Sequence, residues 1–109
     1  MADFNISELF QQAQQLQEKL KSVQEEAAKQ TVEAQSGGGM VKVVADGSMR
    51  IRRITVEPTL LAANDKSMLE DLIVVAVNDA LARANKLMTE AMSKVGPLGG
   101  LKIPGLGGD

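Results

Sequence analysis

The sequence has 109 residues and a formal net charge of −2, which indicates one small, mildly acidic domain. It contains neither cysteine nor histidine, so disulfides, thiolate metal sites and histidine-based catalysis are excluded. The only aromatic residues are Phe4 and Phe10, so a core built from aliphatic side chains is expected to be thin. Shared burial between two copies of the chain would stabilise such a fold, and we therefore expect a homodimer.

Residues 6 to about 30 have the pattern of a long amphipathic helix. Apolar residues recur at alternating steps of three and four, the heptad spacing of a helix that packs against other helices or a sheet. The residues of this seam are Ile6, Leu9, Ala13, Leu16, Leu20, Val23 and Ala27. The opposite face is rich in glutamine and charged residues. Asn5 or Ser7 can cap the start of the helix.

Two short strands and a hairpin are predicted next. Residues 31–36 alternate weakly, and residues 37–39 are three glycines that we expect to form a flexible loop. Those glycines do not predict a phosphate-binding loop, because a strand follows them and not a lysine and a helix. Residues 40–45 predict a strand with Val41, Val43 and Ala45 on one face. The pair Asp46-Gly47 predicts a type I′ hairpin turn, in which both central residues have positive φ.

Residues 49–56 form the third predicted strand, and its apolar pattern changes phase midway. In a regular strand, Met49 and Ile51 would lie on one face of the sheet, and Ile54 and Val56 would lie on the opposite face. One interpretation is a β-bulge near Arg52 and Arg53. The other is that both faces of the strand are partly covered, which would again indicate a second subunit.

A second long helix follows Glu57-Pro58, which ends the third strand. Residues 59–61 predict one helical turn, and Asn64 or Asp65 then caps the long helix. Within this helix Val74 and Val75 widen the apolar stripe to nearly all sides for one turn. A helix that is apolar all round is buried all round, so we expect a subunit interface there. The interface residues expected on this helix and on the third strand are Ile51, Ile54, Leu72, Val74, Val75 and Val77.

The expected domain covers residues 1–94, and residues 95–109 form a tail rich in glycine, proline and leucine. One interpretation of the tail is disorder. The other is a partner-binding segment that uses Leu98, Leu101, Ile103 and Leu106. Neither a signal sequence nor a membrane-spanning stretch is recognisable, so the cytoplasm is the expected compartment.

Positive charge is concentrated in two places. Residues 40–56 contain four basic residues and one acidic residue, a local net charge of +3 in an acidic chain. In the second long helix the acidic residues lie early and the basic residues late. A solvated sheet face with ordinary complementation of the helix dipole is one interpretation, and contact with nucleic-acid phosphates is the other. Because no aromatic residue is placed to stack on bases, duplex DNA fits better than a single strand.

Four segments occur in a characteristic order and spacing between about Leu9 and Met92. They are QAQQLQEKLKSVQEE, GGGMVKV, ITVEPTLL and DKSMLEDLIVVAVNDALARA, and the most specific motifs within them are VEPTLL, LEDL and NDA. These segments resemble the YbaB/EbfC family of bacterial nucleoid-associated proteins. The resemblance implies a tweezer-shaped homodimer that binds DNA in the nucleoid and affects gene expression. It implies neither a cofactor or metal nor catalysis.

The resemblance attributes DNA contact to the first and last helices. The matching basic positions are Lys19, Lys21, Lys29, Arg83, Lys86 and Lys94. We add Arg50, Arg52 and Arg53 because of the local charge of the third strand. The combined expectation is an α+β fold of long helix, three-stranded antiparallel sheet, short helical turn and long helix, with duplex DNA as partner. The alternative is a protein-interaction adaptor that uses the glutamine-rich helix face or the apolar tail.

Overall fold

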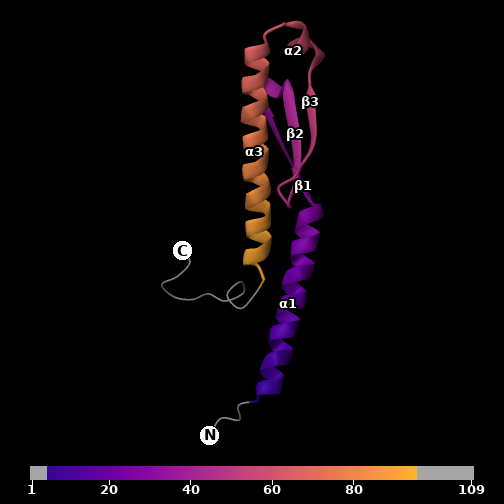
Figure 1. Ribbon diagram of the computed structural model, residues 1–109, viewed down its shortest axis with the longest axis vertical. Coiled ribbons are helices and arrows are strands. Elements are labelled where there is room, and N and C mark those ends of the chain that lie inside the picture. The colour runs from indigo at the N-terminus through magenta and orange to yellow at the C-terminus, as the bar shows by residue number, and fades with distance from the viewer. Residues whose placement is uncertain (1–4, 96–109) are drawn as a thin grey trace, which may run out of the picture.

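The computed structural model describes residues 5–95, which form two long helices and a three-stranded antiparallel sheet (Figure 1). The elements in chain order are α1 (Ile6–Lys29), β1 (Thr31–Ser36), η1 (Gly37–Gly39), β2 (Val41–Asp46), β3 (Ile51–Val56), α2 (Pro58–Ala62) and α3 (Lys66–Ser93). The strands pair in the order β1-β2-β3. The predicted α+β fold is confirmed, and the short helical turn expected at residues 59–61 is α2.

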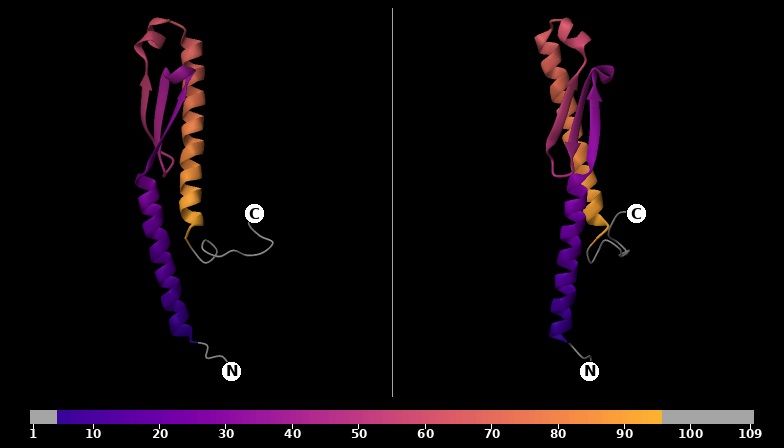
Figure 2. Two further views of the ribbon diagram at one scale, coloured as in Figure 1. Left: turned by 180° about the vertical axis from the view of Figure 1, so that it is seen from behind. Right: turned by 90° about the vertical axis from the view of Figure 1, so that its right-hand side faces the viewer.

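The molecule is long and thin. Its extents are 77 × 29 × 16 Å and its radius of gyration is 20.8 Å, whereas a compact domain of this size has a radius of about 13 Å. α3 runs along one face of the sheet, while α1 extends away from the sheet as an arm (Figures 1 and 2). The heptad seam of α1 is buried at Ala27, but Ile6 and Leu9 are 58% and 46% exposed. The N-terminal part of the seam is therefore not covered within residues 5–95, whereas Leu16, Leu20 and Val23 are partly buried.

The core lies between α3 and the inner face of the sheet. Its buried residues are Ala34, Val41, Val43, Ala45, Leu60, Ala76, Ala80 and Ala84. Ala76, Ala80 and Ala84 recur every four residues on one face of α3, and their small side chains let the helix lie close to the sheet. α3 packs on β1 and β2 and reaches β3 at few positions, so the inner face of β3 is only partly covered.

Both long helices begin at a side-chain cap. Asn5 Oδ1 accepts a hydrogen bond from Glu8 N at 3.3 Å, and Asp65 Oδ1 accepts one from Met68 N at 3.0 Å. These bonds satisfy backbone donors that have no partner within the first turn. Asn64, the other candidate cap of α3, adopts a left-handed conformation with φ of 56°. None of the helices within residues 5–95 is both long and apolar enough to cross a bilayer.

The glycines between β1 and β2 form a tight turn. Gly37, Gly38 and Gly39 have φ of 61°, 66° and 95°, and Met40 N donates to Gly37 O at 3.3 Å. Glycine adopts positive φ readily because it has no β-carbon. The three glycines therefore allow the chain to reverse direction within one turn.

The third strand contains a β-bulge, one of the two interpretations of its change of phase. The pairing register shifts between Val44 and Ala45 of β2, which leaves Arg52 as an extra residue on β3. This bulge brings Ile51 and Ile54 to the same face of the sheet, the face that α3 covers. A bulge, and not coverage of both faces, explains the sequence pattern.

The turn between β2 and β3 differs from the predicted type I′ turn. Among residues 5–95 the non-glycine positions with positive φ include Met49, at 71°, whereas Gly47 does not have positive φ. Asp46 O accepts a hydrogen bond from Met49 N at 3.0 Å, and Asp46 N donates to Arg50 O at 2.9 Å. This is the pattern of a three-residue loop whose last residue is left-handed. The type I′ prediction was wrong, and β3 begins at Ile51 and not at Met49.

Candidate functional site

A buried carboxylate organises the hairpin between β2 and β3. Asp46 has 0% exposure. Its Oδ1 accepts hydrogen bonds from Ser48 Oγ at 2.6 Å, Ser48 N at 2.9 Å and Arg50 N at 3.2 Å. Its Oδ2 accepts a hydrogen bond from Arg52 Nε at 2.6 Å. Both oxygens are satisfied, so the buried charge fixes the loop and the first residues of β3.

These donors hold the pKa of Asp46 well below its usual range. The hydrogen bond from the Ser48 hydroxyl is the largest cause, and burial opposes it by favouring the neutral acid. The Arg52 guanidinium and the backbone N–H groups of Arg50 and Ser48 lower the pKa further. Asp46 is therefore ionised at neutral pH, and Arg52 compensates its charge.

The hairpin is docked on the C-terminal end of α1. Gly47 N donates to Gln30 O at 3.0 Å. A β-carbon at Gly47 would lie 2.0 Å from Ala27 O, which leaves room for glycine alone. This close contact places the loop beside the last turn of α1, which carries Lys29.

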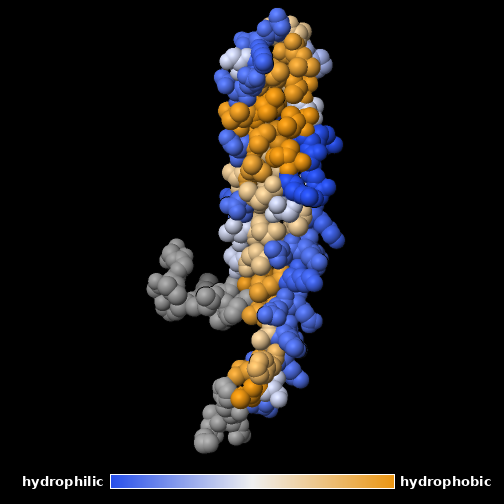
Figure 3. Space-filling view, viewed as in Figure 1, coloured by the Kyte–Doolittle hydropathy of each residue, from blue (hydrophilic) through white to orange (hydrophobic). Residues whose placement is uncertain are grey.

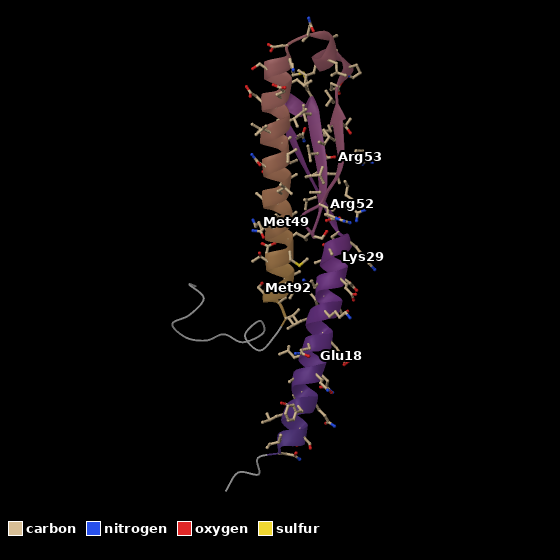
Figure 4. The ribbon with its side chains drawn as sticks, viewed as in Figure 1. Glu18, Lys29, Met49, Arg52, Arg53 and Met92 are labelled. Atoms are coloured by element: carbon tan, nitrogen blue, oxygen red, sulfur yellow. The ribbon has the colours of Figure 1, made fainter. Side chains whose placement is uncertain are left out.

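Several of the candidate basic residues lie near the contact between the β2–β3 hairpin and the C-terminal end of α1. Lys29, Arg50, Arg52 and Arg53 are all exposed, and we call them the hairpin corner. Figure 4 shows Lys29, Arg52 and Arg53 along the same side of the molecule, away from α3. The register places Lys42 on the same outer sheet face as Arg53. Lys42 therefore extends the positive surface along the sheet, away from the hairpin.

The remaining candidate basic residues are not brought together. Consecutive helical residues are about 100° apart, so Lys19 and Lys21, two residues apart, are separated by about 160° the shorter way around α1. Arg83 and Lys86 lie on the flank of α3 that faces β1, and Lys94 is the C-cap of α3. A groove on that flank is lined by Val32, Asp79, Arg83, Lys86, Leu87 and Glu90. Acidic side chains are thus mixed with the basic ones there.

An exposed apolar face lies between α3 and β3. Ile51, Ile54 and Val74 are 36%, 44% and 56% exposed. Val77 lies about 60° from Val74 around the helix, on the same flank. Figure 3 shows apolar side chains gathered between α3 and β3 over the upper half of the molecule, bordered by polar ones. The structure therefore brings together Ile51, Ile54, Val74 and Val77 from the expected subunit interface, and we call them the α3–β3 face.

The other two expected interface residues lie elsewhere. Val75 is also 56% exposed, but it is turned about 100° from Val74, toward the β1 side of α3. The Leu72 side chain packs beside η1 of its own chain, where a β-carbon on Gly37 would lie 3.0 Å from Leu72 Cδ1. The Leu72 carbonyl accepts a hydrogen bond from Ser36 Oγ at 2.6 Å.

From the sequence, Asp46 is predicted only as half of a turn motif. A signal for its role was present, because Asp46 is the single acidic residue among four basic ones in residues 40–56. A serine two positions later is also typical of an aspartate that bonds to its own loop. What the sequence could not show is that the carboxylate is buried.

Comparison with known proteins agrees with the fold and the motifs. The YbaB/EbfC DNA-binding family matches residues 1–101. A nucleoid-associated protein of Thermoanaerobacter pseudethanolicus is 47% identical over 103 residues, which cover 94% of this chain and 91% of that protein. A nucleoid-associated protein of Anaeromyxobacter dehalogenans is 45% identical over 104 residues, covering 95% and 99% of the two chains.

A solved structure shows the same fold at low sequence identity. The crystal structure of an uncharacterized protein from Helicobacter pylori superposes with a TM-score of 0.67 at 21% identity, covering 77% of this chain and 88% of that one. The family match over nearly all residues and the relatives near 47% identity agree with the motifs in the sequence. The chain belongs to the YbaB/EbfC DNA-binding family.

Proposed function

We propose that this protein binds duplex DNA as a homodimer, through the backbone phosphates, and takes part in nucleoid organisation and the modulation of gene expression. Its relatives are named nucleoid-associated proteins, which supports the nucleoid as its location. The observation that carries the proposal is the hairpin corner, where exposed cations gather in a chain of net charge −2. Local positive charge, and not net charge, displaces the counterions of DNA. No catalytic step and no cofactor is part of this function.

The proposed dimer would form through the α3–β3 face. Among residues 5–95 the buried apolar residues larger than alanine are Leu60, Val41 and Val43, which is a small core for an elongated fold. Pairing two copies through the α3–β3 face would bury Ile51, Ile54, Val74 and Val77 and leave the arm of each α1 projecting. A dimer also doubles the phosphate contacts available to one DNA duplex.

A salt titration tests the DNA-binding part of the proposal. Phosphate contacts release condensed counterions, so four to six contacts per dimer predict a log–log slope of affinity against salt of roughly −4 to −5. Fluorescence anisotropy with a short labelled duplex at several salt concentrations measures this slope. No binding even at the lowest salt concentration would contradict the DNA-binding role.

Two matched triple variants locate the contact surface. One changes Arg50, Arg52 and Arg53 to Ala, and the other changes Arg83, Lys86 and Lys94 to Ala. Each variant removes three cations, so a difference in DNA affinity between the two reflects where the cations lie and not the change in net charge. We expect the hairpin variant to bind more weakly. Unaltered affinity of the hairpin variant would confine the contacts to the helices.

An adaptor function is the second candidate, and one observation favours it. Ile6, Leu9 and Phe10 at the start of α1 are 58%, 46% and 67% exposed, and such apolar surfaces often bind proteins. The tail interpreted as a partner-binding segment, residues 96–109, lies outside the described residues. A pull-down from nuclease-treated lysate, with and without residues 96–109, separates the two functions. Partners retained after complete digestion of DNA favour the adaptor.

A further inference from the structure

We infer that the β2–β3 hairpin is a preformed site for a phosphodiester group, in which Arg52 makes the contact and Asp46 is its positioning residue. This inference rests on the proposed DNA binding and names one contact within it. The ligand class is a phosphate carrying a single negative charge, as in the DNA backbone.

The pairing uses only part of the Arg52 guanidinium. In the side-chain hydrogen bonds of residues 5–95, Arg52 donates through Nε alone, to Asp46 Oδ2 at 2.6 Å. The Arg52 side chain is 57% exposed, whereas that of Asp46 is 0% exposed. The guanidinium is planar, so a fixed Nε also fixes the direction of the terminal N–H groups. Phosphate oxygens accept paired N–H donors in this fork geometry.

The hairpin holds Asp46 rigidly before any ligand arrives. Three further hydrogen bonds, from Ser48 and Arg50, hold the carboxylate, and Gly47 locks the loop against α1. Arg52 is the bulge residue of β3, and bulges commonly redirect a side chain beside a binding site. An arginine that is already ordered loses little rotamer entropy on binding, so the contact is stronger than that of a mobile surface cation.

The charges around Arg52 favour an anion on balance. Lys29 and Arg53 lie along the same side (Figure 4), and Arg50 is exposed in the same loop. The opposing exposed charges are Glu25 and Glu26 on α1 and Glu33 on β1. The negative charge of Asp46 is buried beneath Arg52, so a phosphate approaching from solvent meets the guanidinium first.

A second arginine–aspartate pair provides a matched control. Arg83 Nε donates to Asp79 Oδ2 at 3.2 Å, and the Arg83 side chain is 58% exposed, nearly the value for Arg52. The difference lies in the acid, because the Asp79 side chain is 42% exposed whereas that of Asp46 is 0% exposed. Asp79 therefore presents its own negative charge to solvent, and it has no surrounding loop to hold it.

The test compares DNA affinities of Arg52→Ala, Arg52→Lys, Asp46→Asn and Asp79→Asn in the full chain, with the same labelled duplex and salt series. Arg52→Ala should weaken binding roughly fivefold or more and reduce the magnitude of the salt slope by about 2 per dimer, one for each protomer. Arg52→Lys keeps the charge but loses the fork, so it should bind nearly as weakly as Arg52→Ala.

The sign of the Asp46→Asn effect is the sharpest outcome. Removing a negative charge should by itself tighten DNA binding, and we expect that result, or no change, for Asp79→Asn. Asp46→Asn should instead weaken binding, because Arg52 loses the partner that orients it. The double variant Asp46→Asn/Arg52→Ala should bind no more weakly than Arg52→Ala alone, since both changes remove the same contact.

Several results would overturn the inference. If Asp46→Asn or Arg52→Lys binds DNA as tightly as the unaltered protein, the affinity depends on charge alone and not on the orientation of Arg52. If Asp46→Asn unfolds at the titration temperature, Arg52→Lys alone decides the question. Arg52→Ala with unchanged affinity would contradict the hairpin site but leave the proposed DNA binding intact. No binding by the unaltered protein would contradict both.

Discussion

At the scale of single residues, Asp46 sets the conformation of the hairpin. It accepts hydrogen bonds from Ser48, Arg50 and Arg52, and its burial excludes water as an alternative donor. The loop can therefore tolerate Met49 in a left-handed conformation, with φ of 71°, which costs a residue other than glycine about 1–2 kcal/mol. A local energetic cost is offset by the network beneath it.

Acid should destabilise the protein partly through Asp46. In the unfolded chain an aspartate titrates near pH 3.9, and the network lowers the pKa of the folded carboxyl below its usual range. The ionised form therefore contributes stability above about pH 4, and this contribution is lost as pH falls further toward the folded pKa. Thermal melts followed by circular dichroism should show a smaller acid-induced loss for Asp46→Asn than for the unaltered protein. Asp79→Asn is the control, and equal acid sensitivity of the unaltered protein and Asp46→Asn would contradict this account.

Glycine at position 49 should stabilise the hairpin. Met49→Gly relieves the left-handed strain, so the free energy of unfolding should rise by about 0.5–1 kcal/mol after the entropic cost of glycine. Met49→Ala removes the side chain but keeps the strain, so it isolates the backbone effect. Urea denaturation measures both variants. Equal stability of the glycine and alanine variants would show that the left-handed conformation is not strained.

At the scale of elements, the packing of α3 on the sheet depends on small side chains. Ala76, Ala80 and Ala84 have 0% exposure and face β1 and β2. Large side chains would separate the helix from the sheet, because protein interiors are close-packed. The stripe of three alanines therefore sets the distance between α3 and the sheet. At this distance the inner face of β3 lies beside α3 and is only partly covered.

A larger residue in this stripe should be strongly destabilising. Ala80→Leu adds three carbon atoms to a fully packed site, and we expect a loss of about 1–3 kcal/mol in the free energy of unfolding. Ala82→Leu, on the exposed face of the same helix, should change stability by less than about 0.5 kcal/mol. Chemical denaturation of the two variants provides the comparison. Similar losses for both would mean that helix propensity, and not packing on the sheet, decides the effect.

At the scale of the whole molecule, one chain leaves much apolar surface exposed. The radius of gyration of 20.8 Å is well above that of a compact domain of about 100 residues. Ile51, Ile54 and Val74 of the α3–β3 face are exposed within residues 5–95, and so is the N-terminal part of the α1 seam, at Ile6 and Leu9. A second copy of the chain is the proposed cover for the α3–β3 face, and it would also unite two hairpin corners in one particle.

Adjacent valines test that proposal. Val74 and Val75 are equally exposed but lie on different flanks of α3. Val74→Glu would place a charge in the proposed interface and should convert the dimer to monomer in sedimentation experiments at micromolar concentration. Val75→Glu should have a smaller effect. A dimer that survives Val74→Glu, or a stable folded monomer of the unaltered chain, would contradict the proposed interface.

The elements, their order and the family could all be predicted from the residues alone. Periodicity identified the long helices and β-branched alternation identified the strands, because these patterns depend on neighbours along the chain. The phase change from Ile51 to Ile54 left two interpretations, and the strand pairing shows that the bulge is the right one. The conformation of the hairpin and the grouping of the charged and apolar residues became visible only in the folded chain. Asp46 is buried in a hairpin that packs on α1 through Gly47, and Val74 and Val75 are distinguished only by where β3 lies. These features depend on contacts between distant segments, which no local pattern encodes.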